Sequence, residues 1–101
     1  MAEVVNLVWT QPALRQLAEA REYIAIDNPT AARAQIGKIE LTVNRLKAFP
    51  MVGHAGMLPG TREFAVPGTP YTVVYRLLDN RLRILAILHG ARNRNPEIRL
   101  T

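Results

Sequence analysis

The strongest candidates for chemistry in this sequence are the arginines that follow Gly60. Residues 60–101 hold seven arginines and no lysine against three acidic side chains, whereas residues 1–59 hold six basic and five acidic side chains. Arginine forms forked hydrogen bonds to phosphate and carboxylate groups. We therefore take the arginines within or next to expected strands as candidates for binding an anionic partner: Arg62, Arg76, Arg81, Arg83 and Arg92.

Thiol and metal chemistry are not expected in this chain. It contains no cysteine, which excludes disulfides, cysteine nucleophiles and thiolate metal sites. With His54 and His89 as the two histidines, a structural zinc site is not expected either, and we predict no cofactor. His54 lies in a glycine-rich stretch and is expected to be solvated, whereas His89 ends an expected strand close to arginines.

The composition predicts one folded domain over residues 1–101, with a basic charge. Hydrophobic residues make up 49% of the 101 residues and charged residues 21%, an ordinary balance for a globular protein. The net charge of +5 suits an acidic protein, a nucleic acid or a membrane surface. No stretch approaches the ~20 apolar residues of a membrane span, and the first ten residues lack the pattern of a signal peptide. We expect a cytoplasmic protein that does not associate with membranes.

The first half of the chain predicts a strand and two helices that must position these groups. Val4–Trp9 is a short apolar, β-branched run that predicts a strand. Thr10 is expected to cap a helix over Ala13–Ile26, and Asn28 to cap a second helix that ends at Phe49. Because the connection between the two helices is so short, we predict an antiparallel helical hairpin.

The second half predicts three strands after a loop at residues 51–61. Asp79 and Asn80 are expected to form a two-residue hairpin turn. Alternation places Arg76 among apolar neighbours and predicts one apolar face in the last strand, made of Leu82, Ile84, Ala86 and Leu88. The pattern gives an α+β fold in the order β-α-α-β-β-β, with the last three strands expected over Arg62–Val66, Tyr71–Leu78 and Arg81–Leu88.

Several short segments together resemble the ParE/RelE superfamily of toxins from type II toxin-antitoxin modules. They are the strand ending in Trp9, the helix turn YIAIDNPTAA, the helix end at Phe49 and Pro50, and the strand segments GTREF, GTPYTVVYR and ILAILHGAR. The resemblance covers essentially the whole chain. It implies a helical hairpin packed on a small twisted antiparallel sheet, and a bound antitoxin as partner.

The resemblance leaves two activities open, because RelE-like members cut messenger RNA in the ribosome and ParE-like members inhibit DNA gyrase. Metal-independent RNA cleavage needs a group that takes a proton, a group that gives one and cations that stabilise the developing charge. By resemblance, Arg62, Arg76 and Arg92 fall at or near basic positions of the RelE-like site, and His89 is the titrating group expected near them. A RelE-like toxin would use these four residues as a metal-independent endoribonuclease.

Two features favour the ParE-like reading. The tail NRNPEIRLT has no tyrosine and the loop MVGHAGMLPG has no basic residue, whereas RelE-like nucleases resemble one another in having both. Tyr71 and Tyr75 alternate with Val73 on an apolar face, so we expect them in the core with satisfied hydroxyls.

By resemblance, then, we expect a toxin that binds DNA gyrase and is neutralised by a ParD-like antitoxin, which lays an amphipathic segment over the hairpin and sheet. Ribosome-dependent cleavage of messenger RNA is the alternative. A degenerate toxin that retains its antitoxin-binding surface is a third possibility.

Overall fold

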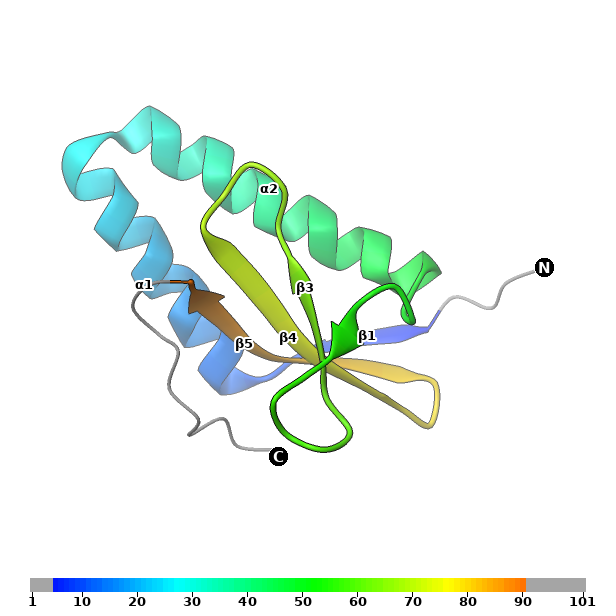
Figure 1. Cartoon of the computed structure of the whole chain (residues 1–101). Coiled ribbons are helices and arrows are strands. Elements are labelled where there is room, and N and C mark those ends of the chain that lie inside the picture. The colour runs from blue at the N-terminus through cyan, green and yellow to red at the C-terminus, as the bar shows by residue number, and fades with distance from the viewer. Residues whose placement is uncertain (1–4, 91–101) are drawn as a thin grey trace.

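The computed structural model describes residues 5–90, in which two helices cover one face of a five-stranded sheet (Figure 1). The elements follow the expected order, with one short strand added after the helices. Their bounds are β1 Asn6–Trp9, α1 Gln11–Asp27, α2 Pro29–Ala48, β2 His54–Ala55, β3 Arg62–Ala65, β4 Tyr71–Leu78 and β5 Arg81–His89. No helix within residues 5–90 is long and apolar enough to cross a membrane.

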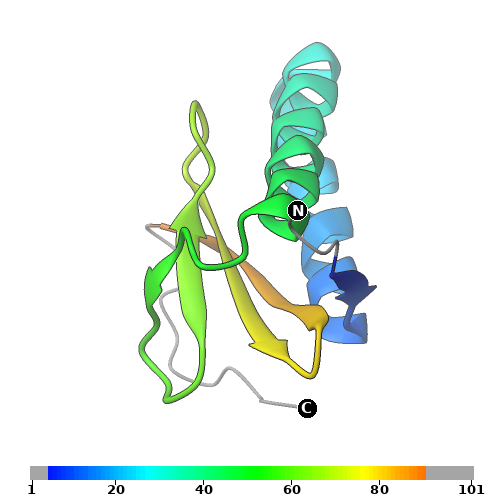
Figure 2. The same ribbon diagram turned by 90° about the vertical axis from the view of Figure 1, so that its right-hand side faces the viewer.

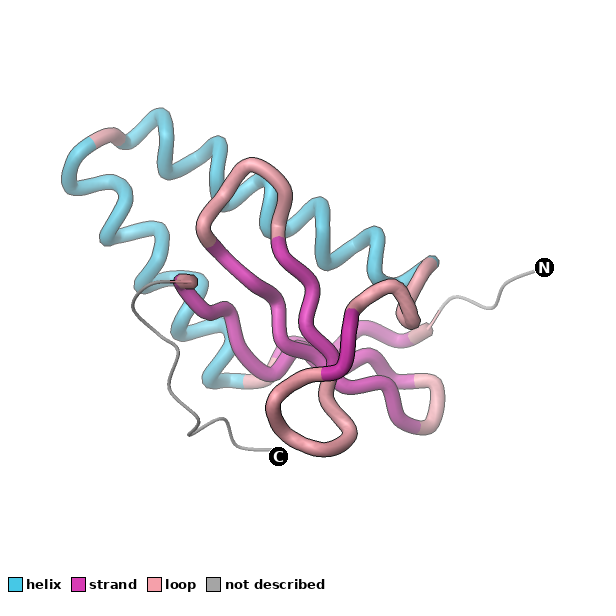
Figure 3. Tube along the Cα trace, in the orientation of Figure 1, coloured by secondary structure: helices cyan, strands magenta, loops and turns pink. Residues whose placement is uncertain are grey.

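The α+β fold class is confirmed, but the sheet is mixed and not purely antiparallel. Its strand order is β1-β5-β4-β3-β2, with β1 parallel to β5 and every other pair antiparallel. Figure 3 shows the strands in magenta and the two helices in cyan. Parallel pairing needs a long crossover, and here the helical hairpin follows β1 and carries the chain across the sheet. The expected loop at residues 51–61 contributes β2, because His54 and Ala55 pair with Glu63 and Arg62.

Side-chain caps fix both helix starts, as the sequence predicted. The Thr10 hydroxyl accepts a hydrogen bond from the Ala13 amide at 3.4 Å, and the Asn28 carboxamide oxygen accepts one from the Ala31 amide at 3.0 Å. The Thr10 hydroxyl also donates to the Ile84 carbonyl oxygen at 2.7 Å. This contact ties the start of α1 to β5.

The main core lies between the helices and the sheet, which form two layers in Figure 2. A stripe on α2 points toward the sheet, and each large aliphatic side chain buried in this way contributes roughly 1.5–3 kcal/mol. Tyr75 is fully buried in the same layer, as expected. The stripe and the strand residues that meet it include Ile36, Ile39, Val43, Leu46, Val73, Leu82 and Ile84.

A β-bulge in β5 overturns one predicted face. The pairing steps from Val74↔Ala86 to Tyr75↔Ile84, so Leu85 has no partner on β4. Strand side chains alternate strictly, and one extra residue therefore reverses the faces beyond it. The prediction that Leu82, Ile84, Ala86 and Leu88 share a face was wrong for this reason: Leu82, Ile84 and Ile87 join the helix-side core, and Leu85, Ala86 and Leu88 cluster with Val74 on the other face.

Two polar details stabilise β5 and the turn that precedes it. The Ile87 amide, beside the bulge, donates to the Gln16 side-chain oxygen on α1 at 2.8 Å, so this buried donor is satisfied. Asp79 and Asn80 both adopt positive φ angles, of 52° and 60°, as a tight hairpin turn requires. The two-residue turn predicted there is confirmed without a glycine, because Asn and Asp tolerate this backbone region better than other side chains.

Candidate functional site

Three of the candidate arginines gather on the face of the sheet that points away from the helices, here called the outer face. Arg76 on β4 lies directly opposite Arg83 on β5. Arg81 projects from the same face as Arg83, because it lies two residues earlier on that strand. We call these three residues the arginine cluster.

The arginine cluster carries charge that the described part of the fold does not neutralise. Within residues 5–90, none of its three guanidinium groups makes a hydrogen bond or an ion pair with another residue. Like charges directly opposite on neighbouring strands are destabilising. Arg76 and Arg83 are half-buried and Arg81 is exposed, so the cluster remains open to solvent. Such an arrangement can bind carboxylate or phosphate groups through forked hydrogen bonds.

Arg62 has a different environment from the cluster, because it lies opposite Tyr75 on the helix side of the sheet. Its Nη1 donates to the carbonyl oxygens of Gly53 at 2.7 Å and Met51 at 3.3 Å. The Tyr75 hydroxyl donates to the Pro50 carbonyl oxygen at 2.8 Å and accepts from the Gly53 amide at 2.9 Å. The two side chains therefore hold the segment between α2 and β2 in place.

Burial of the Tyr75 ring raises the pKa of its hydroxyl above 10.0, although the hydrogen bond from Gly53 and the charge of Arg62 act in the opposite direction. The site also explains why residue 53 is glycine. A Cβ atom there would lie 2.5 Å from the Tyr75 hydroxyl and 2.8 Å from the Glu63 carbonyl oxygen. Both distances are far shorter than van der Waals contact, so the loop can approach Tyr75 only without a side chain at position 53.

His89 is not brought together with the arginine cluster. It pairs with Tyr71 at the opposite end of β4, and the two rings meet edge to face with centroids 5.3 Å apart. Tyr71 lies five residues from Arg76, which corresponds to roughly 17 Å along a strand. The Tyr71 ring also belongs to the helix-side core, whereas Arg76 lies on the outer face. His89 instead borders a hollow near the tip of the helical hairpin.

Two further sequence candidates are placed as follows. His54 is exposed on β2, as expected for a solvated loop histidine, and its ring nitrogen lies 3.0 Å from the Ala55 carbonyl oxygen. Arg92 lies outside the described residues. Within those residues, no three acidic or histidine side chains gather closely enough to hold a metal ion.

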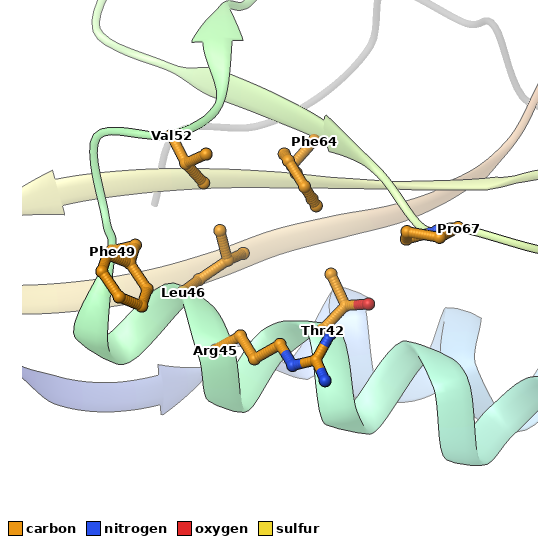
Figure 4. A pocket seen from close by; sticks show the side chains of 7 residues that line it. All are labelled: Thr42, Arg45, Leu46, Phe49, Val52, Phe64 and Pro67. Carbon is orange, nitrogen blue, oxygen red and sulfur yellow. The ribbon is translucent and has the colours of Figure 1, made fainter.

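A second surface feature, which the sequence did not predict, is an apolar groove between α2 and β3 (Figure 4). Its cavity has a volume of ≈ 190 Å³. Figure 4 shows apolar side chains from the helix end, the following loop and β3 around this hollow, with Arg45 beside it. The groove is lined by Thr42, Arg45, Leu46, Phe49, Val52, Phe64 and Pro67. The apolar residues Phe49, Met51 and Val52 around the helix-ending Pro50 are the sequence signal that could have indicated it.

The fold and family comparisons place the chain among the toxins of type II toxin-antitoxin systems. Residues 7–94 match the family described as ParE toxin of type II toxin-antitoxin system, parDE, and the chain therefore belongs to this family. The putative toxin Y4kP of Sinorhizobium fredii is 35% identical over 82 residues, which span 81% of this chain and 84% of that toxin. The resemblance inferred from the sequence is confirmed.

Relatives of both toxin types occur among the similar proteins. Toxin ParE3 of Caulobacter vibrioides is 42% identical over 64 residues, 61% of this chain and 62% of that toxin. Toxin RelE2 of the same organism is 29% identical over 89 residues, 88% of this chain and 99% of that toxin.

Two solved structures share the fold, each with 24% sequence identity to this chain. The chromosomal ParDE system from P. aeruginosa matches with a TM-score of 0.77, over 85% of this chain and 96% of the matched chain. The toxin-antitoxin complex RelBE2 from Mycobacterium tuberculosis matches with a TM-score of 0.60, over 86% of this chain and 99% of the matched chain.

Proposed function

We propose that this protein is a ParE-like toxin that acts by binding DNA gyrase, and that a ParD-like antitoxin neutralises it. Membership of the ParE toxin family over residues 7–94 is the observation that carries the proposal. The geometry of the described residues supports it. The arginine cluster is arranged for binding an anionic surface, and His89 lies at the other end of β4, beside Tyr71.

In the proposed mechanism, the arginine cluster binds carboxylate groups of the target. Arg76 and Arg83 lie directly opposite each other on neighbouring strands, so the sheet fixes the spacing of their backbones before binding. Pairing with carboxylates would remove the repulsion between them and add forked hydrogen bonds. Arg62 contributes indirectly in this proposal, because its donors already hold the backbone of residues 51 and 53.

Ribosome-dependent cleavage of messenger RNA is the second candidate function. The similarity to Toxin RelE2 over 88% of this chain favours it. This mechanism would require Arg62, Arg76, His89 and Arg92 to act at one phosphate. The separation of roughly 17 Å along β4 between the partner of His89 and Arg76 supports the binding mechanism over this one.

A side-by-side assay of the purified toxin tests the proposal. Gyrase supercoiling and the integrity of ribosome-bound message would be measured with the same preparation over the same toxin concentrations. We expect supercoiling to be inhibited and the message to stay intact. Cleaved message with fully active gyrase would overturn the proposal in favour of the nuclease.

A growth assay tests whether the protein is a degenerate toxin that retains its antitoxin-binding surface. Expression of the wild-type chain without antitoxin should arrest growth and induce DNA-damage signalling. Unaffected growth at a confirmed protein level would show that only antitoxin binding has been retained.

A further inference from the structure

The hollow near the tip of the helical hairpin, here called the tip hollow, lies where four segments of the chain meet. The end of α1, the start of α2 and the adjoining ends of β4 and β5 line it. Its cavity has a volume of ≈ 270 Å³. Pockets for drug-sized ligands have volumes of roughly 300–1,000 Å³, so the tip hollow suits a smaller molecule.

The charge of this lining is opposite to that of the whole chain. The net charge of the chain is +5, yet no lysine or arginine within residues 5–90 lines the tip hollow, and Asp27 does. Asp27 is exposed, and its carboxylate makes no hydrogen bond or ion pair with another described residue. The last turn of α1 also holds no basic residue that could complement the negative end of the helix dipole. The tip hollow therefore offers negative charge that the described part of the chain does not neutralise.

A buried hydrogen-bond acceptor belongs to the same lining. The side-chain oxygen Oε1 of Gln35 is buried and accepts no hydrogen bond from the residues that the structure describes. A buried acceptor without a donor destabilises a fold, so its presence calls for an explanation. The neighbouring Asn28 oxygen does not share this state, because it accepts a hydrogen bond from the Ala31 amide. An N–H group of a bound molecule would satisfy Gln35.

Three aromatic side chains also line the tip hollow. Tyr71 and His89 meet edge to face with ring centroids 5.3 Å apart, and Tyr23 joins them from α1. Tyr71 is 3% exposed and Tyr23 is 50% exposed, so the aromatic lining extends from the core to the solvent. The faces of aromatic rings attract cations, and ammonium groups are commonly bound among such rings.

We infer that the tip hollow binds a small aliphatic cation, an amine or a guanidine, which pairs with Asp27 and donates an N–H hydrogen bond to Gln35. Its carbon chain contacts the aromatic rings. A small anion would meet the uncompensated carboxylate, and an uncharged molecule would leave that carboxylate unpaired.

This site is separate from the surface that the proposed function uses. Tyr71 and Arg76 lie five residues apart on β4, and Tyr71 belongs to the helix-side core, whereas Arg76 lies on the outer face. The inference therefore goes beyond the proposed function and does not depend on it.

An NMR titration of the full-length, ¹⁵N-labelled protein tests the inference. The probes are agmatine, which carries a guanidinium and an ammonium group, and putrescine, which carries two ammonium groups. We expect both to shift the amide signals of residues around the tip hollow, with a dissociation constant of about 1 mM or lower. The uncharged match of putrescine, 1,4-butanediol, should bind at least about 10-fold more weakly.

Three variants assign the binding to these residues. Asp27→Asn should weaken agmatine binding about 10-fold, because it removes the carboxylate. Gln35→Leu should weaken it about 5-fold, but its melting temperature without ligand should stay equal or rise by up to about 4 °C, because a buried acceptor without a donor is removed. Glu19→Gln removes the same charge from an exposed position on α1 outside the tip hollow, and should bind within about 2-fold of the wild type.

Thermal melts give a second readout and establish that each variant is folded. Agmatine at ten times its dissociation constant should raise the melting temperature of the wild type by about 4 °C or more, and that of Asp27→Asn by clearly less. Equal binding of putrescine and 1,4-butanediol would overturn the inference. So would shifts confined to residues outside the tip hollow, or unchanged agmatine binding by folded Asp27→Asn. Gyrase inhibition does not enter these readouts, so a failure here leaves the proposed function standing.

Discussion

At the scale of single residues, Tyr75 and Arg62 are side chains suited to catalysis that hold a loop instead. The Tyr75 hydroxyl links the Pro50 carbonyl oxygen and the Gly53 amide, and it is buried at 0% exposure. The sequence predicted its burial from alternation along β4. It could not predict the hydrogen-bond partners, because they lie 22 and 25 residues away in the chain.

Removal of the Tyr75 hydroxyl should destabilise the protein. Tyr75→Phe leaves the part-buried Pro50 carbonyl oxygen and the buried Gly53 amide without their partner, and we expect the free energy of unfolding to fall by about 1–3 kcal/mol. Urea denaturation measures the change. Ile26→Val, at a side chain that is 81% exposed, is the control and should change it by less than about 0.5 kcal/mol. Equal values for the two variants would contradict the structural role of Tyr75.

Tyr75 should also make stability sensitive to alkaline pH. Its pKa is raised in the folded state, so the folded protein holds this proton more tightly than the unfolded chain, whose value is 10.0. The contribution is complete below pH 10.0 and is lost as the pH rises through the folded-state pKa. Above about pH 10, wild-type stability should therefore fall more steeply than that of Tyr75→Phe. Parallel curves would rule out this linkage.

At the scale of elements, β5 contributes side chains to both the core and the arginine cluster. Its apolar residues were all recognised as strand residues, but their faces were not, because one unpaired residue at Leu85 reverses the alternation. A bulge is a tertiary feature with no marker in this stretch of sequence. The bulge does not affect the arginine cluster, because Arg81 and Arg83 precede it and keep their alternation with Leu82.

Replacement of an arginine in the cluster should have opposite effects on stability and on gyrase inhibition. Arg83→Thr removes a charge directly opposite Arg76 and introduces a residue that favours strands. We expect the free energy of unfolding to stay equal or rise by up to about 0.5 kcal/mol. Gyrase inhibition should weaken about 10-fold or more. Arg83→Lys keeps the charge but loses the forked hydrogen bonding of the guanidinium group, and its gyrase inhibition should lie between those of the wild type and Arg83→Thr. Unaltered inhibition by Arg83→Thr would remove the cluster from the proposed mechanism.

At the scale of the whole molecule, the arginine cluster and the apolar groove differ in chemistry as well as in face. The outer face presents three arginines, while the groove is apolar with one arginine at its edge. The caps, the hairpin and four of the five strands within residues 5–90 could be predicted, because they depend on local patterns. The groove and the parallel position of β1 could not, because they arise where distant segments meet.

Salt should weaken binding at the arginine cluster. With a net charge of +5, association of the cluster with an acidic target should be steered electrostatically. Raising ionic strength from about 0.05 M to 0.3 M should lower the association rate with gyrase about 10-fold. Surface plasmon resonance measures this. An association rate that does not change with salt would argue against the arginine cluster as the gyrase-binding surface.

The parallel pairing of β1 with β5 also has a consequence for how the protein is made. β5 is the last strand to leave the ribosome among those described, yet it lies between β1 and β4 in the sheet. Until it arrives, β1 has no neighbour, and the apolar stripe of α2 lacks Leu82 and Ile84 as partners. Folding must therefore wait for contacts between distant parts of the chain, which are slow to form. A nascent chain that ends before Arg81 should neither fold nor present the paired arginines of the outer face.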